Sequence, residues 1–287
     1  RRVNAEGVKF GIWIEPEMIS EDSDLYREHP DWAMQNPGRN PARGRNQLVL
    51  DFSREDVREH IFDQICRVLD QGNIEYIKWD MNRSVTDFYS VENRQGRVSY
   101  DFVTGLYDFM EKLLARYPKL MIEGCSGGGG RFDAGMMYYT PQIWCSDNTD
   151  AINRTRIQYG SSFFYPVSVV GAHVSDVPNH QTGRITSLNT RGITAMAGTF
   201  GYEMNPALLS EEDKAVIREQ IKTYKKYETL ICQGDYYRLS NPFCDECSAW
   251  MFASKDKKQA LVNVVRLDVQ GNMAATYIRL KGLNKES

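Results

Sequence analysis

Carboxylates, aromatic rings and a lysine stand at the ends of several apolar runs in this sequence. One run closes with Lys78-Trp79-Asp80-Met81-Asn82, and a later one closes with Trp144-Cys145-Ser146-Asp147. Sugar-cleaving sites use this set of groups. A ring stacks on the apolar face of the sugar, polar groups bind its hydroxyls, and two carboxyl groups act on the anomeric carbon and the leaving oxygen. The residue types therefore predict a glycosidase.

Asp80 is the expected nucleophile. Lys78 lies two residues earlier, so in a strand both side chains project from one face. A nearby ammonium group keeps a carboxylate ionised, as a nucleophile must be. The alternative is a structural Lys–Asp pair that fills the interior of the fold. Flanking Trp79 and Asn82 and the other polar strand ends favour catalysis.

Two aspartates compete for the role of general acid/base. Asp150 precedes Ala-Ile-Asn-Arg, which resembles the beginning of a helix, so Asp150 is a candidate N-cap. Asp147 lies nearer the end of the apolar run, where a proton donor reaches the glycosidic oxygen. We therefore expect Asp147 to be the acid/base. Glu15 and Glu17 form an alternative carboxylate pair, but Pro16 between them and the long loop that follows favour a scaffold or loop-anchoring role.

Other polar motifs have a structural alternative. The glycines 127–130 lack the Gly-Lys-Ser/Thr of a phosphate-binding loop and predict a tight turn whose backbone N–H groups approach a sugar hydroxyl. Arg131 after them is either functional or an ion-pair partner, and Arg45 taken alone is more typical of a solvated side chain. His173 and His180 lack the spacing of a metal site, so no metal and no cofactor is expected.

Composition excludes several classes of partner. The 287 residues are 41% hydrophobic and 25% charged with a net charge of −3, and the basic residues are scattered. These values indicate neither a nucleic-acid nor a membrane partner. No apolar run reaches the roughly 18 residues of a membrane span. Six cysteines, with Cys244 and Cys247 as an isolated pair, indicate reduced thiols and a cytoplasmic location.

The elements that must position these residues are strands alternating with amphipathic helices. Helices are expected over Ser53–Gln71, with Ser53 and Asp56 in capping-box spacing, and over Asp101–Tyr117. Near-continuous apolar strands between such helices predict a parallel sheet covered by helices. The expected strands are Val8–Ile14, Gln47–Phe52, Tyr76–Trp79, Leu120–Glu123, Gln142–Cys145, Phe164–Val170 and Thr194–Thr199.

Seven such units predict a (β/α)8 TIM barrel that lacks its first strand, with the missing unit upstream of Arg1. A long helix over Leu209–Gln233, capped by Ser210, closes this catalytic domain at about residue 236. Alternating runs over Ser248–Ser254, Ala260–Leu267 and Ala274–Leu280 then predict the start of an antiparallel β-sandwich domain from 237 to 287. We therefore expect a fragment of a longer protein.

The ordered motifs resemble those of the glycoside hydrolase family 36 α-galactosidases. The resemblance rests on six segments between Gly7 and Leu283, nearly the whole chain, and each one alone would be weak. The segments are Trp13-Ile14-Glu15-Pro16-Glu17-Met18, Leu48-Val49-Leu50-Asp51-Phe52, Lys78-Trp79-Asp80-Met81-Asn82-Arg83, Cys125-Ser126-Gly127-Gly128-Gly129-Gly130-Arg131, Ser146-Asp147-Asn148-Thr149-Asp150 and Gly171-Ala172-His173-Val174-Ser175.

The resemblance implies a retaining hydrolase of terminal α-galactosides of the melibiose and raffinose type, with Asp80 as nucleophile and Asp147 as acid/base. Their carboxyl groups should then lie about 5–5.5 Å apart. The resemblance also implies substrate-binding residues, and it moves Arg45 into the site. The substrate-binding residues that it implies are Trp13 as the stacking ring, Arg45, Lys78, Trp79, Asn82, and Cys125 with Gly128 near the sugar 2-hydroxyl.

The resemblance further implies a homo-oligomer, typically a tetramer, and an oligosaccharide substrate. It also implies a pair of aspartates after the first barrel strand, upstream of this chain. Two alternatives stay open: a galactosyl transferase of the raffinose or stachyose synthase kind, and an α-N-acetylgalactosaminidase. A carbohydrate-binding protein on a degenerate barrel is a third, which the presence of both aspartates disfavours.

Overall fold

The computed structural model describes residues 2–92, 95–269, 271–272 and 275–284. By its internal contacts the chain divides into two compact units, residues 1–143 and 144–287. We describe each unit by itself. Within the described ranges, no helix has the length and apolar character that crossing a membrane requires.

A four-stranded parallel sheet with the order β1-β4-β5-β6 forms the centre of the first unit. Trp13 is paired with Lys78, and Lys78 in turn with Glu123. Because the strands are parallel, the residues that follow them gather at one edge of the sheet. The strands are β1 (Gly11–Ile14), β4 (Tyr76–Trp79), β5 (Met121–Gly124) and β6 (Gln142–Ile143).

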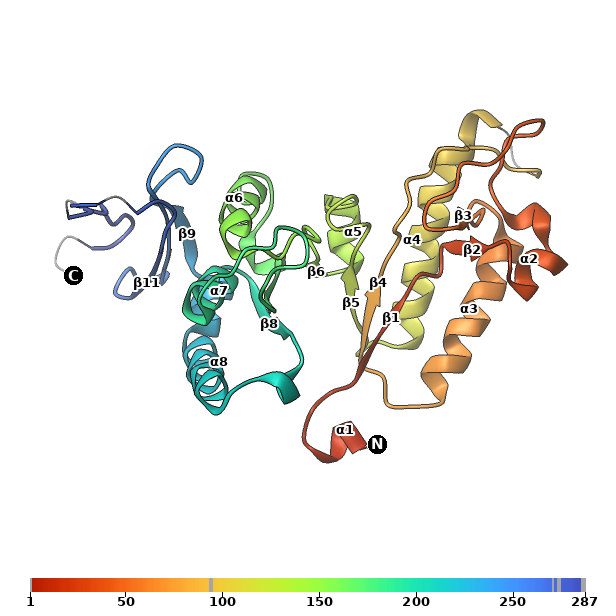
Figure 1. The fold of residues 1–287 in the computed structure, drawn as a ribbon. Helices are drawn as coiled ribbons and strands as arrows, with labels where there is room; N and C mark the ends of the chain where they lie inside the picture. The colour runs from red at the N-terminus through yellow and green to blue at the C-terminus, as the bar shows by residue number, and fades with distance from the viewer. Residues whose placement is uncertain (1, 93–94, 270, 273–274, 285–287) are drawn as a thin grey trace. The chain divides into compact units, whose positions relative to one another are not determined.

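Two long helices, α3 (Glu55–Asp70) and α4 (Val98–Arg116), run alongside β1 and β4 (Figure 1). The apolar faces predicted for both helices are confirmed as buried. Removing these side chains from water holds the helices against the sheet. The buried positions are Val57, Ile61, Ile65 and Leu69 of α3, and Phe102, Leu106, Phe109 and Leu113 of α4. The short helices of this unit are α1 (Arg2–Ala5), α2 (Asp24–Glu28), η1 (Pro30–Trp32), η2 (Gln95–Arg97) and α5 (Ala134–Tyr139).

The start of α3 differs from the prediction. Its N-cap is Arg54, which makes no side-chain capping bond, so the predicted capping box at Ser53 is wrong. The Ser53 hydroxyl donates instead to the buried Asp51 carboxylate, which also accepts the Ser53 backbone N–H at 3.1 Å. Asp51 competes successfully for the hydroxyl because a buried carboxylate needs hydrogen-bond donors.

The predicted strand Gln47–Phe52 does not belong to the parallel sheet. Its strand part, β3 (Gln47–Val49), pairs antiparallel with β2 (Met18–Ser20) in a separate two-stranded ladder. The apolar run that suggested a barrel strand is buried, with Leu48, Val49 and Leu50 fully enclosed. Burial and alternation alone do not distinguish the two kinds of pairing. The described residues therefore contain six strands in parallel pairs, and the prediction of seven βα units is wrong.

In the second unit, β7 (Gly171–Ser175) pairs in parallel with β8 (Thr199–Glu203). The predicted strands Phe164–Val170 and Thr194–Thr199 begin seven and five residues before the strands β7 and β8. The first contains Pro166 and the 3₁₀ turn η3 (Val167–Val169), and the second covers the end of α7 (Leu188–Ala195). At Gly198, directly before β8, an added Cβ would lie 2.2 Å from the Val170 carbonyl oxygen, so only glycine fits at this close approach of two backbone segments.

The other helices of this unit are α6 (Ala151–Ser161), the short η4 (Pro206–Leu208) and α8 (Glu211–Gln233), and α7 packs directly against β7 and β8. Ser210 caps α8 as predicted, because its hydroxyl accepts the Asp213 N–H at 3.0 Å.

An antiparallel sheet of three strands follows α8. It has the order β11-β10-β9 and consists of β9 (Asp235–Arg238), β10 (Cys247–Ala253) and β11 (Ala260–Arg266). Two of the three predicted strands are confirmed, and β9 was not predicted. Residues 275–280 of the third predicted strand are irregular, and Ala274 lies outside the described residues. The predicted domain boundary at 236/237 stays a prediction.

Candidate active site

Asp80 directly follows β4, and its carboxylate accepts hydrogen bonds from three segments of the first unit. The Trp13 indole Nε1 donates to Oδ2 at 3.1 Å, and the Asn82 amide Nδ2 donates to the same oxygen at 2.8 Å. The backbone N–H groups of Met81 and Gly127 donate to Oδ1 at 2.8 and 3.4 Å. The residue is only 5% exposed, so these donors take the place of water around the carboxylate.

These donors decide the ionisation of Asp80. Burial alone would raise the pKa of its carboxyl, because low polarity disfavours the charged form. The hydrogen bonds, led by that of Trp13, outweigh burial and hold the pKa of Asp80 below its ordinary value. The ionised state that a nucleophile needs is therefore supplied by neutral donors, whereas we had expected the Lys78 ammonium to supply it.

Lys78 lies on β4, two residues before Asp80, with its ammonium group 3.4 Å from Glu123 Oε1. Glu123 is fully buried and also accepts the Tyr76 hydroxyl at 2.5 Å. The sequence had not singled out Glu123 as a functional residue, although its position on β5, paired with Lys78, would have placed the two side chains on one face of the sheet.

Cys125 and the glycine turn border the same carboxylate. The Cys125 thiol hydrogen-bonds Asp80, and burial together with the charge of Asp80 raises the pKa of this thiol to about 12. Gly127 and Gly128 have φ angles of 52° and 84°, in the left-handed region that glycine tolerates. The predicted turn is therefore present, and its Gly127 N–H binds Asp80, where we had expected it to approach a sugar.

Trp79 does not lie with these residues. Its ring is fully buried, packs against Phe109 at 5.5 Å between centroids, and donates its indole N–H to Glu17 at 2.7 Å. Arg131 completes this buried group with two hydrogen bonds to Glu17 at 2.8 and 2.9 Å. Adjacent strand residues point to opposite faces, so Lys78 and Trp79 cannot both face the site. The Trp79 side chain has no exposed surface that a substrate could contact, so the prediction that it binds the substrate is wrong.

Arg45 reaches the site from a tight turn. Gly44 and Gln47 exchange both backbone hydrogen bonds across Arg45 and Asn46, whose φ angles are 52° and 60°. Two positive φ angles define a type I′ hairpin turn, which is costly for a residue other than Gly, Asn or Asp. The Arg45 guanidinium is largely exposed and lies 3.8 Å from Glu15 Oε1. Arg45 therefore lies close to Glu15 in this unit, and its role in substrate binding stays a prediction.

Glu15, just past β1, connects several of these residues. Its Oε1 accepts the Asn82 side-chain Nδ2 at 2.5 Å and the Asn82 backbone N–H at 3.1 Å. Its Oε2 accepts the Gln47 amide at 3.2 Å. The predicted loop-anchoring role therefore describes only part of what Glu15 contacts, since Asn82 in turn contacts Asp80.

Asp147 lies in the second unit, three residues after Trp144. The buried Trp144 ring donates its indole N–H to Asp147 Oδ1 at 3.0 Å, while Asp147 itself is exposed. The Arg154 guanidinium and the His173 ring contact the Trp144 ring at 4.9 and 4.7 Å. Asp147 is thus an accessible carboxyl group that a buried indole N–H holds in place.

Asp150 is the N-cap of α6, as predicted. It accepts the backbone N–H groups of Ile152 and Asn153 at 3.0 and 2.9 Å, together with the Thr182 hydroxyl and the Arg184 guanidinium. Burial opposes these contacts, but they lower the pKa of the Asp150 carboxyl on balance. A buried carboxylate that is fully occupied in this way is a poor proton donor.

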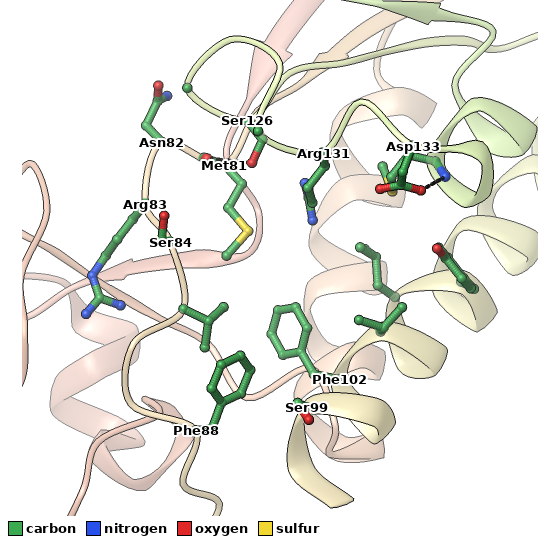
Figure 2. Close-up of a pocket in the computed structure, with 17 residues that line it drawn as sticks. Met81, Asn82, Arg83, Ser84, Phe88, Ser99, Phe102, Ser126, Arg131 and Asp133 are labelled. Atoms are coloured by element: carbon green, nitrogen blue, oxygen red, sulfur yellow. Dashed lines mark hydrogen bonds between the residues drawn. The ribbon is translucent and has the colours of Figure 1, made fainter. Parts of the chain in front are cut away.

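A cavity of about 630 Å³ lies beside the Asp80 site within the first unit. Figure 2 shows Asn82 and Ser126 at one end of it, and Phe88 and Phe102 at the other. Its walls come from the segments after β4 and β5 and from α4. Asp80 is not among its lining residues, so the cavity adjoins the carboxylate but does not contain it.

His173 and His180 do not take part in a metal site within the described ranges, where no three His, Cys, Asp or Glu side chains gather around one point. The tilted packing of the His173 ring against Trp144 agrees with a structural role for that imidazole.

Comparison with known proteins adds the family. Residues 1–234 match the family described as Melibiase, and residues 247–287 match the glycosyl hydrolase family 36 C-terminal domain. The chain belongs to the melibiase family. Melibiase relatives include the bifunctional alpha-galactosidase/sucrose kinase AgaSK of Mediterraneibacter gnavus, which is 69% identical over 100% of this chain and 30% of its own length. Alpha-galactosidase AgaA of Geobacillus stearothermophilus is 50% identical over 99% of this chain and 39% of its own.

Solved melibiase structures agree closely with this fold. The galactosidase domain of AgaSK superimposes with a TM-score of 0.95, at 70% identity, over 99% of this chain and 39% of that one. A variant of AgaA from Geobacillus stearothermophilus in complex with raffinose gives 0.97 at 49% identity, over 99% and 40%. These matches confirm the predicted fold class, part of a TIM barrel followed by the start of an antiparallel β-domain. The chain spans 30% to 40% of the length of these relatives.

Proposed function

We propose that this chain carries the catalytic residues of a retaining α-galactosidase that hydrolyses terminal α-D-galactosides. The observation that carries the proposal is Asp80, a buried carboxylate at the C-terminal end of a barrel strand, kept ionised and oriented by neutral donors. Catalytic groups of this fold lie at that end of the strands. The names of the relatives, all alpha-galactosidases, support the choice of sugar.

In this proposal Asp80 attacks the anomeric carbon, and a bond forms between a carboxylate oxygen and that carbon as the bond to the leaving oxygen breaks. Asp147 protonates the leaving oxygen. It then takes a proton from water, which attacks the anomeric carbon of the β-linked galactosyl-enzyme and releases Asp80 as a carboxylate. Two inversions give net retention. The reaction needs the two carboxyl groups about 5–5.5 Å apart.

The choice of Asp147 over Asp150 rests on availability. Asp147 is exposed and holds one hydrogen bond from a buried ring, whereas Asp150 is buried and saturated by its capping contacts. An acid/base must exchange a proton with the leaving group and then with water, so it needs access to both.

Recognition of the sugar is proposed for the groups around Asp80. The half-exposed Trp13 ring stacks on the sugar. Lys78, Arg45 and Asn82 supply hydrogen bonds to its hydroxyls, and Cys125 with the glycine turn borders the 2-position. Relatives crystallised with raffinose and stachyose support an oligosaccharide of that type as substrate.

The test uses the full-length protein and p-nitrophenyl α-D-galactoside, with Asp80→Ala and Asp147→Ala. Loss of activity alone shows only that each residue matters, so azide is added to both variants. With Asp80 removed, azide attacks the anomeric carbon itself, and a single inversion gives β-galactosyl azide. With Asp147 removed, azide displaces Asp80 from the galactosyl-enzyme, and two inversions give α-galactosyl azide.

Proton NMR of the azide product distinguishes the two outcomes. The α-anomer from Asp80→Ala, or unchanged turnover by that variant, contradicts the assignment of the nucleophile. Product analysis with sucrose as acceptor separates hydrolysis from galactosyl transfer. Absence of p-nitrophenol release by the wild-type protein would favour a binding protein.

Two broader proposals concern the whole protein. We propose a homo-oligomer, to be tested by light scattering of the full-length protein. We also propose a cytoplasmic location, supported by six cysteines that form no disulfide in the described part of the chain. Activity measurements on fractionated cells test this location.

A further inference from the structure

Glu15 connects the candidate nucleophile to the loop that carries Arg45. It belongs to neither set of residues that the sequence assigned to catalysis or binding. Its side chain is 7% exposed, and both of its oxygens accept hydrogen bonds. A carboxylate this enclosed is costly unless it is paired, and here the partners are Asn82, Gln47 and Arg45.

The contacts of Asn82 fix which way its amide faces. A side-chain amide has one nitrogen with two hydrogens and one oxygen. The Asn82 Nδ2 donates to Glu15 Oε1 at 2.5 Å and to Asp80 Oδ2 at 2.8 Å, so both hydrogens are used. The reversed amide would place its oxygen against two carboxylates, which repel it. Among the described residues, no hydrogen bond to Asn82 Oδ1 is found.

We propose that Glu15 is a positioning residue for substrate recognition, which acts by locking the Asn82 amide so that its Oδ1 accepts a sugar hydroxyl. A sugar hydroxyl can then bind Asn82 only by donating its hydrogen to Oδ1. This inference rests on the proposed function, because it takes the sugar to bind beside Asp80.

The Glu15 carboxylate also positions a hydrogen-bond donor, the Arg45 guanidinium. Glu15 lies 3.8 Å from the Arg45 guanidinium and holds the turn of that residue through Gln47. Arg45 presents only donors. One buried anion thus fixes an acceptor at Asn82 and a donor at Arg45, a pairing that suits two neighbouring hydroxyls, one donating and one accepting.

The experiment is a double-mutant cycle on the full-length protein with p-nitrophenyl α-D-galactoside. Glu15→Ala should lower kcat/KM about thirtyfold in the wild-type background, mostly through KM. In the Asn82→Ala background the same change should cost only about threefold, the remainder coming from the loosened Arg45 turn. Equal factors in the two backgrounds would overturn the inference.

Two further variants keep the result interpretable. Glu15→Gln retains the shape and one acceptor oxygen, so it should lose less activity but show the same dependence on Asn82, and it carries the test if Glu15→Ala does not fold. Glu21→Gln removes the carboxylate that pairs with Arg43 in the loop that carries Arg45, and it should leave kcat/KM unchanged. A loss with Glu21→Gln as large as with Glu15→Ala would also overturn the inference.

The proposed function fails in a different way, namely if the wild-type protein releases no galactose. In that case the cycle is measured on the midpoint of thermal unfolding. Non-additive shifts for Glu15→Ala and Asn82→Ala support the locked amide, and additive shifts overturn it.

Discussion

Trp13→Phe should move the acid limb of the pH–activity profile. The substitution keeps an aromatic ring but removes the indole N–H that donates to Asp80 Oδ2 at 3.1 Å. A hydrogen bond to a charged group contributes about 1.5–3 kcal/mol. Trp13 is 50% exposed, so water replaces part of the lost donor, and we take about 1.4 kcal/mol as the net loss.

That free energy corresponds to a rise of about one unit in the pKa of Asp80. The folded-state pKa of Asp80 lies below its unfolded value, so its ionisation stabilises the fold above the unfolded pKa. This stabilisation is lost as the pH falls through the folded pKa. Removing one donor raises the folded pKa, so the variant should lose activity at a pH about one unit higher on the acid side, and some stability near neutral pH.

The assay is kcat/KM of the full-length protein for p-nitrophenyl α-D-galactoside, measured from strongly acidic to neutral pH. Trp250→Phe is the matched control, because the buried Trp250 indole N–H has no partner among the described residues. A uniform loss of activity by Trp13→Phe at every pH, with the acid limb in place, would refute the reasoning. It would show that the ring only stacks.

Three further outcomes follow from local contacts. Asp150→Ala removes the N-cap of α6 and leaves Arg184 unpaired, so it should destabilise the protein by about 2 kcal/mol or more, measured by urea unfolding. Gly105→Ala should destabilise it more strongly, because the new Cβ would lie 2.2 Å from the Phe52 carbonyl oxygen. At mildly alkaline pH, iodoacetamide should leave Cys125 unmodified, since this thiol is buried and its pKa is about 12.

The glycine substitution and the cysteine labelling each have a control within the chain. Gly160→Ala, in α6 with open space around the new Cβ, should stabilise the protein by about 0.4–1 kcal/mol, in contrast to Gly105→Ala. The exposed Cys244 should react with iodoacetamide in the same sample, as read by peptide mass spectrometry. Rapid labelling of Cys125 would contradict the burial of its thiol, and equal effects of the two glycine substitutions would contradict the close packing of Gly105 against Phe52.

The sequence predicted best where a pattern depends on burial alone. Tyr76–Trp79 coincides with β4, and the apolar faces of α3 and α4 are buried as expected. The partner of a strand is not encoded in its own alternation, which is why Gln47–Phe52 was placed in the wrong sheet. Phe164–Val170 is strand-like by composition, but Pro166 and the following 3₁₀ turn delay the strand to Gly171.

The site divides in the same way. Strand alternation placed Asp80 and Lys78 on one face, and it should also have excluded Trp79, which the family resemblance brought in. The Asp80 donors Trp13 and Gly127 come from segments 67 and 47 residues away, so their role as donors depended on tertiary contacts. Glu15 was discounted because Pro16 follows it, a local argument that carries no information on Asn82.

The hydrogen bonds around Asp80 have a consequence for the lifetime of the proposed covalent intermediate. A carboxylate of low basicity is a weaker nucleophile, but it is also a better leaving group. The donors at Oδ1 and Oδ2 that restrain Asp80 during attack would stabilise the same oxygens as the galactosyl ester breaks. Such a site balances formation of the ester against its hydrolysis and keeps the enzyme from stalling in the acylal-like state between the two.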